Sequence, residues 1–403
     1  MSLKRLKRLS LILFGGLLSL FFVFPAWAAE PGFRLPENPV EGRRLFVSKG
    51  CARCHTVWGE GGTGGPDLGK ISPAGSFLQL AGILWNHSPQ MTERMGEKGI
   101  QRPTFTPEEM AKLVAYLYSL QYFGEAGDPA RGKALFAEKS CIKCHSVGGK
   151  GGEIGPPLDK FGRFLSPIAM AQAMWNHGPE MATAMQALKI PRPKFEGKEI
   201  ADLLAYIRVE GKGGEGIYML PGSPTEGRRL FQDKDCIKCH AVRGKGGTIG
   251  PDLGRRELKR TVSEVAGIMW NHAPHMWAKM KTLRISEPKF SGKEMADLIA
   301  YLYFTGYLDE PGDHLKGKRI FSEKGCMACH SLGGKGGKVG PDLSRSKAVT
   351  SPIDLASALW NHAPAMEKVI EEQRLPWPRF EGENMRDLVA YLQSFTKATV
   401  PKR

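Results

Sequence analysis

The sequence has no cysteine outside one repeated motif and, after its N-terminal segment, no long apolar run. All eight of its cysteines fall in four copies of one short motif, and none is left over. After residue 28 no apolar stretch is long enough to span a bilayer, so the remainder is expected to be soluble. Strand-like segments do not alternate with helical ones, which disfavours βαβ domains. Basic residues stand singly, without the long runs or interleaved aromatics that nucleic-acid grooves use.

What the sequence does contain is Cys-x-x-Cys-His, four times over. This spacing is the attachment pattern of c-type haem, in which both thiols bond covalently to the porphyrin edge and the adjoining histidine becomes an iron ligand. The sequence therefore predicts four covalently attached haem c groups, each with its iron. The cysteines are Cys51, Cys54, Cys141, Cys144, Cys236, Cys239, Cys326 and Cys329, and the expected proximal iron ligands are His55, His145, His240 and His330.

Two other kinds of site also use cysteine pairs. A redox dithiol of the thioredoxin kind expects one Cys-x-x-Cys beside a βαβ pattern, which this sequence does not show. A zinc site needs two such pairs converging on one ion, whereas these pairs lie about ninety residues apart and each has its own histidine. The histidine at the fifth position of all four copies favours haem.

The first 28 residues form a predicted secretory signal peptide. Four basic residues precede an apolar run from Leu9 to Phe24, and a small-residue cleavage site ends at Ala28. The run is slightly short for a bilayer span, which favours cleavage after Ala28. The predicted location is the periplasm, an oxidising compartment where free cysteine pairs would otherwise close into disulfides. The alternative is an uncleaved segment that anchors the protein to the outer face of the inner membrane.

The formal charge of +16 shrinks once this segment and haem are considered. Loss of four basic residues with the signal peptide and addition of eight propionates would leave about +4 before the irons are counted. A mildly basic surface suits redox donors and acceptors with acidic docking surfaces better than it suits nucleic acid. We expect redox protein partners, no nucleic acid, and a membrane contact only if the first segment is retained.

The chain repeats the same landmarks four times. Each repeat carries a Gly-x-x-x-Phe stretch, the haem motif, a glycine-rich loop ending in Gly-Pro-x-Leu, a Trp-Asn-His-x-Pro-x-Met segment and an amphipathic last helix. Repeats one and three share Glu-Gly-Arg-Arg-Leu-Phe, so a dihaem pair is the expected unit of duplication, with a glycine-rich joint beginning at Gly211. The expected boundaries are 1–28 for the signal peptide and 29–123, 124–213, 214–308 and 309–403 for four domains.

Each repeat is predicted to be mainly helical, because its landmark residues recur at helical spacing. Gly42 and Phe46 lie one turn apart, as do Leu113 and Tyr116 near the end of the repeat, and the other repeats keep both pairs. A glycine opposite aromatic residues allows two helices to cross closely. The expected fold class is all-α, with four tandem small helical domains, each built around one haem.

These landmarks resemble those of class I cytochrome c domains, and the resemblance covers nearly all of the chain after the signal peptide. It implies that the first and last helices cross at the glycine and aromatic positions. It also implies that a loop proline carbonyl accepts a hydrogen bond from the haem-ligating histidine, which would fix the imidazole tautomer and tune the iron. By position these prolines are Pro66, Pro156, Pro251 and Pro341.

The chain departs from this family at the distal ligand. The family carries a methionine in a Met-Pro-x-Phe stretch before the last helix, and all four repeats lack it there. The upstream Trp-Asn-His-x-Pro-x-Met segment offers a histidine and a methionine one helical turn apart, so both could face the same haem. The favoured distal ligands are Met91, Met181, Met276 and Met366, and the alternatives are His87, His177, His272 and His362.

The neighbours of these candidates also have expected roles. The proline two residues after each histidine should end or kink the helix there. If methionine is the ligand, the histidine is expected to hydrogen-bond a propionate or water. Each tryptophan is expected to pack, with its indole N–H reaching a haem propionate. These tryptophans are Trp85, Trp175, Trp270 and Trp360.

The preferred function is a tetrahaem electron carrier without catalytic residues, whose haems are too well ligated to bind a substrate. The alternative is a haem enzyme, such as a peroxidase or a nitrogen- or sulfur-oxide reductase, which needs one repeat with an open distal site. A further methionine one turn on, at Met95, Met185 and Met280, becomes Ile370 in the last repeat, and no other position of this kind breaks the pattern. A third candidate is the cytochrome subunit of a dehydrogenase.

Overall fold

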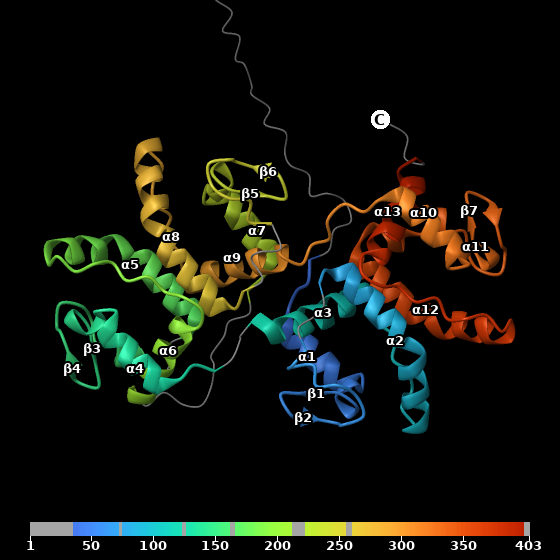
Figure 1. Cartoon of the computed structure of the whole chain (residues 1–403), viewed down its shortest axis with the longest axis horizontal. Coiled ribbons are helices and arrows are strands. Elements are labelled where there is room, and N and C mark those ends of the chain that lie inside the picture. The colour runs from blue at the N-terminus through green and yellow to red at the C-terminus, as the bar shows by residue number, and fades with distance from the viewer. Residues whose placement is uncertain are drawn as a thin grey trace, which may run out of the picture. The chain divides into compact units, whose positions relative to one another are not determined.

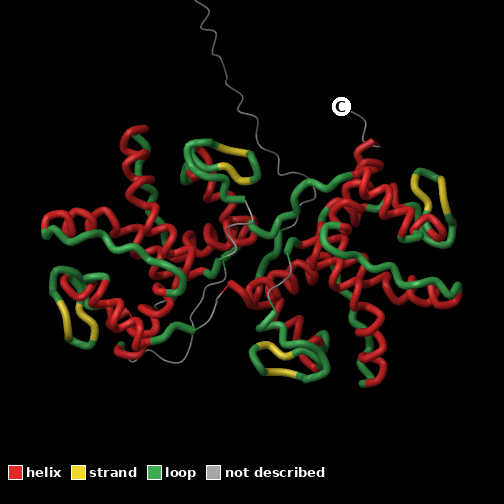
Figure 2. The backbone as a smooth tube through the Cα atoms, in the orientation of Figure 1, coloured by secondary structure: helices red, strands yellow, loops and turns green. Residues whose placement is uncertain are grey.

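The computed structural model describes residues 35–71, 75–122, 126–161, 166–211, 222–254 and 260–398 (Figure 1). These residues form helices joined by loops and by short two-stranded hairpins (Figure 2), so the predicted all-α fold class is confirmed. None of the helices in this part of the chain is long and apolar enough to cross a membrane. The expected signal peptide lies outside the described residues, as does the glycine-rich stretch after Gly211.

The first two repeats contain a first helix, a single turn at the haem motif, an antiparallel hairpin, a long helix and a last helix. Repeat one consists of α1 (Pro39–Ser48), η1 (Cys51–Arg53), β1 (Thr56–Val57), β2 (Glu60–Gly61), α2 (Phe77–Glu97) and α3 (Pro107–Tyr122). Repeat two consists of α4 (Pro129–Glu138), η2 (Cys141–Lys143), β3 (Ser146–Val147), β4 (Lys150–Gly151), η3 (Leu158–Phe161), α5 (Pro167–Ala187) and α6 (Glu199–Glu210).

The last two repeats keep this order. Repeat three consists of α7 (Pro224–Asp233), η4 (Cys236–Lys238), β5 (Ala241–Val242), β6 (Lys245–Gly246), α8 (Val262–Leu283) and α9 (Gly292–Thr305). Repeat four consists of α10 (His314–Glu323), α11 (Cys326–Cys329), β7 (Ser331–Leu332), β8 (Lys335–Gly336), η6 (Leu343–Arg345), η7 (Lys347–Thr350), α12 (Pro352–Glu372) and α13 (Asn384–Ala398). The expected boundaries at 123 and 213 fall outside the described residues, and the boundary at 308 stays a prediction.

The first and last helices of each repeat cross at a glycine. A Cβ atom on Gly42 would lie 1.9 Å from the carbonyl oxygen of Lys112 and 2.8 Å from Cβ of Tyr116. Only a residue without a side chain lets α1 approach α3 this closely. Phe46 then packs on the ring of Tyr116, with the ring centroids 5.4 Å apart. The corresponding glycines are Gly132, Gly227 and Gly317, which approach α6, α9 and α13 in the same way.

The long helices pack across repeats rather than mainly within them. The helix α2 packs against α12, and α5 packs against α8 (Figure 1). Repeat one is therefore paired with repeat four, and repeat two with repeat three. The expected unit of duplication joins repeats one and two, and repeats three and four, so the pairs formed in space differ from the pairs that follow one another in the sequence.

Repeats one and three meet through four tyrosines at the ends of α3 and α9. The Tyr303 hydroxyl donates to the carbonyl oxygen of Tyr118 at 2.7 Å, and the Tyr118 hydroxyl donates to the carbonyl oxygen of Ser76 at 3.0 Å. The ring of Tyr118 lies 4.5 Å from that of Tyr307, and the ring of Tyr122 lies 4.7 Å from that of Tyr303. Burial raises the pKa of all four hydroxyls, which fits their place inside this contact.

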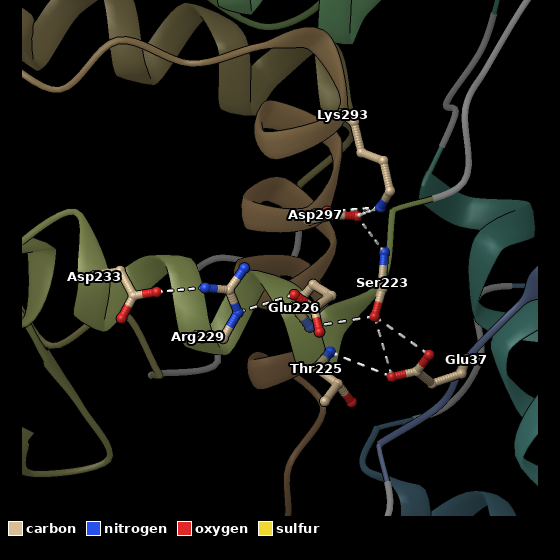
Figure 3. Close-up of polar contacts among 8 residues, drawn as sticks. All are labelled: Glu37, Ser223, Thr225, Glu226, Arg229, Asp233, Lys293 and Asp297. Carbon is tan, nitrogen blue, oxygen red and sulfur yellow. Dashed lines mark hydrogen bonds and ion pairs between the residues drawn. The ribbon is translucent and has the colours of Figure 1, made fainter.

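The start of α7 is fixed from two sides (Figure 3). The backbone N–H of Ser223 donates to Oδ1 of Asp297 in α9 at 2.7 Å, and Lys293 pairs with the same carboxylate at 2.8 Å. From repeat one, the Glu37 carboxylate accepts from the Ser223 hydroxyl and from the backbone N–H of Thr225, both at 3.3 Å. A carboxylate at a helix N-terminus is favourable because it meets unpaired N–H groups. This is a second contact between repeats one and three.

We expect Gly42→Ala to destabilise the protein, because the new methyl group would overlap the backbone of α3. Overpacking of this kind costs about 1–3 kcal/mol of unfolding free energy. The matched control is Gly96→Ala in α2, where an added Cβ would meet no atom within 4 Å and where alanine should stabilise the helix by up to about 1 kcal/mol. Chemical denaturation of the two variants measures both effects, and equal stabilities would contradict the close crossing.

Candidate functional site

Each Cys-x-x-Cys segment forms a single helical turn that starts after a residue with left-handed backbone geometry. This residue is Gly50 (φ 87°), Ser140 (φ 63°), Asp235 (φ 64°) or Gly325 (φ 72°). The turn brings the two cysteines of each motif, three residues apart, to the same side. In repeat one the backbone N–H of His55 donates to the Cys51 carbonyl at 3.0 Å, which continues the turn as far as the histidine.

The first cysteine of each motif lacks the lowered pKa of a redox dithiol. None of the eight cysteines forms a disulfide, and all are half-buried. Burial raises the pKa of the first cysteine of each motif to about 11, whereas redox dithiols work as thiolates with a lowered pKa. These first cysteines are Cys51, Cys141, Cys236 and Cys326. In the part of the chain that the structure describes, no three His, Cys, Asp or Glu side chains converge to hold a metal ion.

The imidazole beside each motif is held by the glycine-rich loop. The Nδ1 atom of His55 lies 3.1 Å from the carbonyl oxygen of Pro66. Because a carbonyl oxygen only accepts, Nδ1 carries the proton and Nε2 keeps its lone pair. The corresponding distances are 2.9 Å for His145 and Pro156, 3.1 Å for His240 and Pro251, and 3.1 Å for His330 and Pro341.

A glycine of the same loop lies against each imidazole ring. A Cβ atom on Gly65 would lie 2.6 Å from Cε1 of His55, and on Gly155, Gly250 or Gly340 it would lie 2.4 Å from Cε1 of the corresponding histidine. The loop therefore has no room for a side chain at this position. Two thiols on one turn, an imidazole with a free Nε2 and a loop closed against the ring together fit a haem bonded through its edge.

The segment before the last helix runs beside the haem motif. The ammonium group of Lys49, two residues before Cys51, donates to the carbonyl oxygen of Thr104 at 2.9 Å and pairs with Glu109 at 2.9 Å. In the same way the ammonium group of Lys139 donates to the backbone carbonyl oxygen of Lys194 at 2.7 Å, and that of Lys234 donates to the backbone carbonyl oxygen of Lys289 at 2.9 Å. This is the segment in which the family carries its distal methionine, and this chain has none there.

The long helix of each repeat carries both distal candidates. The expectation is that the proline ends or kinks this helix, and the helix does not end there, because all four helices run on past their prolines, which are Pro89, Pro179, Pro274 and Pro364. A proline inside a helix removes one hydrogen bond and favours a kink, and Figure 1 shows α2 and α8 changing direction along their length. The four candidate histidines are exposed, and the four candidate methionines are half-buried.

The tryptophan and asparagine of this helix bind the paired repeat. The indole N–H of Trp85 donates to the carbonyl oxygen of Pro378 at 2.6 Å. The Asn86 side chain donates to the carbonyl oxygen of Phe380 at 2.7 Å and accepts from the Phe380 N–H at 2.8 Å. Repeat four makes the same contact with repeat one, through Trp360 on Pro103 and Asn361 on Phe105. Repeats two and three make it with each other, through Trp175 on Pro288, Asn176 on Phe290, Trp270 on Pro193 and Asn271 on Phe195.

The expectation that the indoles reach haem propionates is therefore wrong. All four indole N–H groups donate to a backbone carbonyl of another repeat, and the tryptophans are buried there. A buried indole needs one acceptor, and a proline carbonyl is well suited because it lies in a segment without regular backbone pairing.

Sequence reasoning gave no role to these asparagines or to the residue before the interface proline. Arg102 lies 4.0 Å over the ring of Trp360, and Trp377 stacks on Trp85 with the ring centroids 4.2 Å apart. Repeat two has Arg192 at this position, and repeat three has an exposed Glu287. Recurrence of asparagine after each tryptophan, and of phenylalanine two residues after each proline, was the pattern that could have indicated a shared interface.

Comparison with known proteins gives one family and several partial relatives. A family model described as cytochrome c matches residues 39–121, 129–209, 224–303 and 315–396. The cbb3-type cytochrome c oxidase subunit FixP of Sinorhizobium medicae is 27% identical over 190 residues, which cover 41% of this chain and 58% of that protein. Cytochrome c oxidase subunit 2 of Alkalihalophilus pseudofirmus is 31% identical over 105 residues, 23% of this chain and 29% of that protein. The matched region thus spans less than two thirds of either relative.

We expect Gly65→Ala to disturb one site out of four. The added methyl group would lie 2.6 Å from Cε1 and 2.7 Å from Nδ1 of His55, so the ring must move away from Pro66. The visible and electron paramagnetic resonance spectra of the oxidised, haem-loaded protein should change for one haem and stay unchanged for three. Gly292→Ala, whose Cβ would meet no atom within 4 Å, is the control. A Gly65→Ala spectrum identical to that of the control would contradict the loop contact.

Proposed function

This chain belongs to the cytochrome c family and carries four covalently attached haem c groups, and on that basis we propose that it is a periplasmic electron carrier with one haem in each repeat. Haem supplies reversible one-electron chemistry, and the chain holds it, buries it and sets its surroundings. The observation that carries the proposal is that the same site is built four times: two cysteines on one turn, an imidazole bonded to a proline carbonyl, and a glycine against the ring.

In this proposal the iron ligands come from two elements of each repeat. The proximal ligand is Nε2 of the motif histidine, because its Nδ1 is bonded to the loop proline. The distal ligand is the methionine of the long helix. Its half-burial beside an exposed histidine one turn earlier supports this choice, because a ligand side chain lies under the porphyrin rather than in water. The histidines His87, His177, His272 and His362 are the alternative distal ligands.

An enzyme would need one repeat that offers an open iron and nearby acid or base groups. All four repeats keep histidine and methionine at the same two positions of the long helix, and Ile370 replaces a methionine only one turn further on. Because all four repeats keep the same candidate ligands, an electron carrier is favoured over a peroxidase or an oxide reductase.

Electron exchange inside the chain is proposed within the spatial pairs, one with four and two with three. The three residues Pro103 to Phe105 lie between the two halves of such a pair. Thr104 is bonded to Lys49 beside the haem motif of repeat one, while Pro103 accepts from Trp360 in repeat four. A few bonded residues thus connect the haem motif of one repeat with the long helix of another.

The partners and location are part of the same proposal. The export pattern at the N-terminus supports the periplasm, with retention of that segment as a membrane anchor as the alternative. We propose redox proteins with acidic docking surfaces as donors and acceptors. The relatives FixP and subunit 2 are named as oxidase subunits, which favours a terminal oxidase as one partner. A second candidate function is the cytochrome subunit of such an oxidase or of a dehydrogenase.

Spectroscopy of the oxidised protein tests this assignment. We expect every haem to be low-spin and six-coordinate, and cyanide at moderate concentration to leave the spectrum unchanged. Met91→Leu should make one haem of four high-spin, because leucine offers no lone pair to the iron. His87→Gln and Met95→Leu should leave all four low-spin, and both serve as matched controls on the same helix.

Three results would revise the proposal in different ways. A high-spin haem in His87→Gln together with an unchanged Met91→Leu variant would assign histidine as the distal ligand. Six-coordinate iron in both variants would exclude both residues. A haem of the unmodified protein that is high-spin and binds cyanide would favour an enzyme over a carrier.

A further inference from the structure

The contact that pairs the repeats does not by itself choose between partners. Each repeat offers an indole N–H and an asparagine amide from its long helix, and each offers the acceptors, which are backbone atoms of the segment before the last helix. Backbone groups are alike in every repeat, so the same bonds fit any two of them. Another feature must favour the observed pairs, which are one with four and two with three.

One position of the long helix differs in repeat two. The residue after each candidate histidine is buried in all four repeats, and in repeat two it is Gly178. The other repeats carry a side chain at this position, as Ser88, Ala273 and Ala363. Glycine is less stable than alanine in a helix interior, so a glycine there indicates a reason of packing.

The space above Gly178 is filled by a tryptophan of repeat three. A Cβ atom on Gly178 would lie 2.3 Å from Cη2 and 2.7 Å from Cζ2 of Trp277. The Trp277 side chain is 9% exposed, with the ring of Trp175 6.0 Å away and the guanidinium group of Arg192 5.3 Å from its centre. The ring is therefore enclosed by repeat two and has no room to swing aside for a methyl group.

Hydrogen bonding does not explain the place of Trp277. Its indole N–H is buried and has no hydrogen-bond partner among the described residues. A buried donor left unpaired costs free energy. What the side chain gains comes from fitting its ring into the space that Gly178 leaves and from the cation–π contact with Arg192.

The other repeats have no comparable ring at the position of Trp277. They carry Thr92, Ala182 and Glu367 there. Glu367 of repeat four interacts with Thr92 and Arg102 of repeat one instead. Tryptophan and glycine thus each occur once at these two positions, and the two residues face each other.

We propose that Trp277 and Gly178 determine which repeats pair. Against repeat one or repeat four, the ring of Trp277 would meet the Cβ atom of Ser88 or Ala363, where repeat two has no side chain. A clash of this kind excludes partners that share all the attractive contacts. With repeat three committed to repeat two, repeats one and four are left with each other. This inference concerns the pairing alone and does not depend on the proposed function.

Hydrogen exchange of the full, haem-loaded chain tests the collision. The amides of Phe195 and Phe290 are bonded across the pair formed by repeats two and three. Gly178→Ala should speed their exchange by about tenfold or more, because the added methyl group forces the pair apart. Adding Trp277→Ala to the same chain should restore their protection, since the colliding ring is then gone.

Moving the tryptophan tests whether it selects the partner. Glu367 stands in repeat four where Trp277 stands in repeat three. Glu367→Trp should collide with Ser88 and speed exchange of the Phe105 and Phe380 amides, which are bonded across the pair formed by repeats one and four. Adding Ser88→Gly should restore the protection of these two amides, because it recreates the space that repeat two offers.

The matched control is Gly96→Ala, where an added Cβ meets no atom within 4 Å and both pairs should stay protected. Unchanged exchange in Gly178→Ala, or tolerance of Glu367→Trp without Ser88→Gly, would overturn the proposal. If Gly178→Ala fails to fold, recovery of the fold with Trp277→Ala supports the proposal, and no recovery overturns it. Intact mass of each variant reports whether four haems are attached, which distinguishes a loss of pairing from a loss of haem.

Discussion

The bond pattern of Trp85 and Asn86 recurs in every repeat, and it always crosses to another one. An indole N–H and a side-chain amide bind backbone atoms of the segment before the last helix of the paired repeat, which has no regular backbone partner of its own. Each contact is returned, so every pair holds two copies of it. The side-chain amide of the asparagine pairs with both the backbone N–H and the backbone carbonyl of one buried phenylalanine, and leaving these two groups unpaired would be costly. The position of each long helix, and of the distal candidates on it, depends on this contact.

The arrangement follows from a duplicated dihaem unit. An offset of 185 residues relates Tyr118 to Tyr303 and Tyr122 to Tyr307, and these tyrosines meet one another between repeats one and three. The same offset relates the contact between repeats one and four to the contact between repeats three and two. Self-complementary contacts of this kind are typical of a twofold homodimer. The chain is thus built like such a dimer of dihaem units fused into one polypeptide.

Local chemistry made part of the structure predictable. The four haem motifs and the glycine of the helix crossing each depend on residues close in sequence or on one spacing. The partner of Trp85 lies 293 residues away, and a tryptophan alone does not indicate which carbonyl it will find. The proline inside each long helix indicated a helix end or a kink, and the helix does not end there, because packing of both of its halves outweighs one lost hydrogen bond.

Hydrogen exchange of the full chain tests the pairing of the repeats most directly. The amide of Phe380 in repeat four is held by Asn86 in repeat one at 2.8 Å. Asn86→Ala should therefore speed exchange in residues 375–383 by about tenfold or more, since a buried hydrogen bond of this kind is lost, while the exposed Gln90→Ala control on the same helix should not. Unchanged exchange in residues 375–383, or faster exchange in residues 188–195 of repeat two instead, would contradict the pairing of repeat one with repeat four.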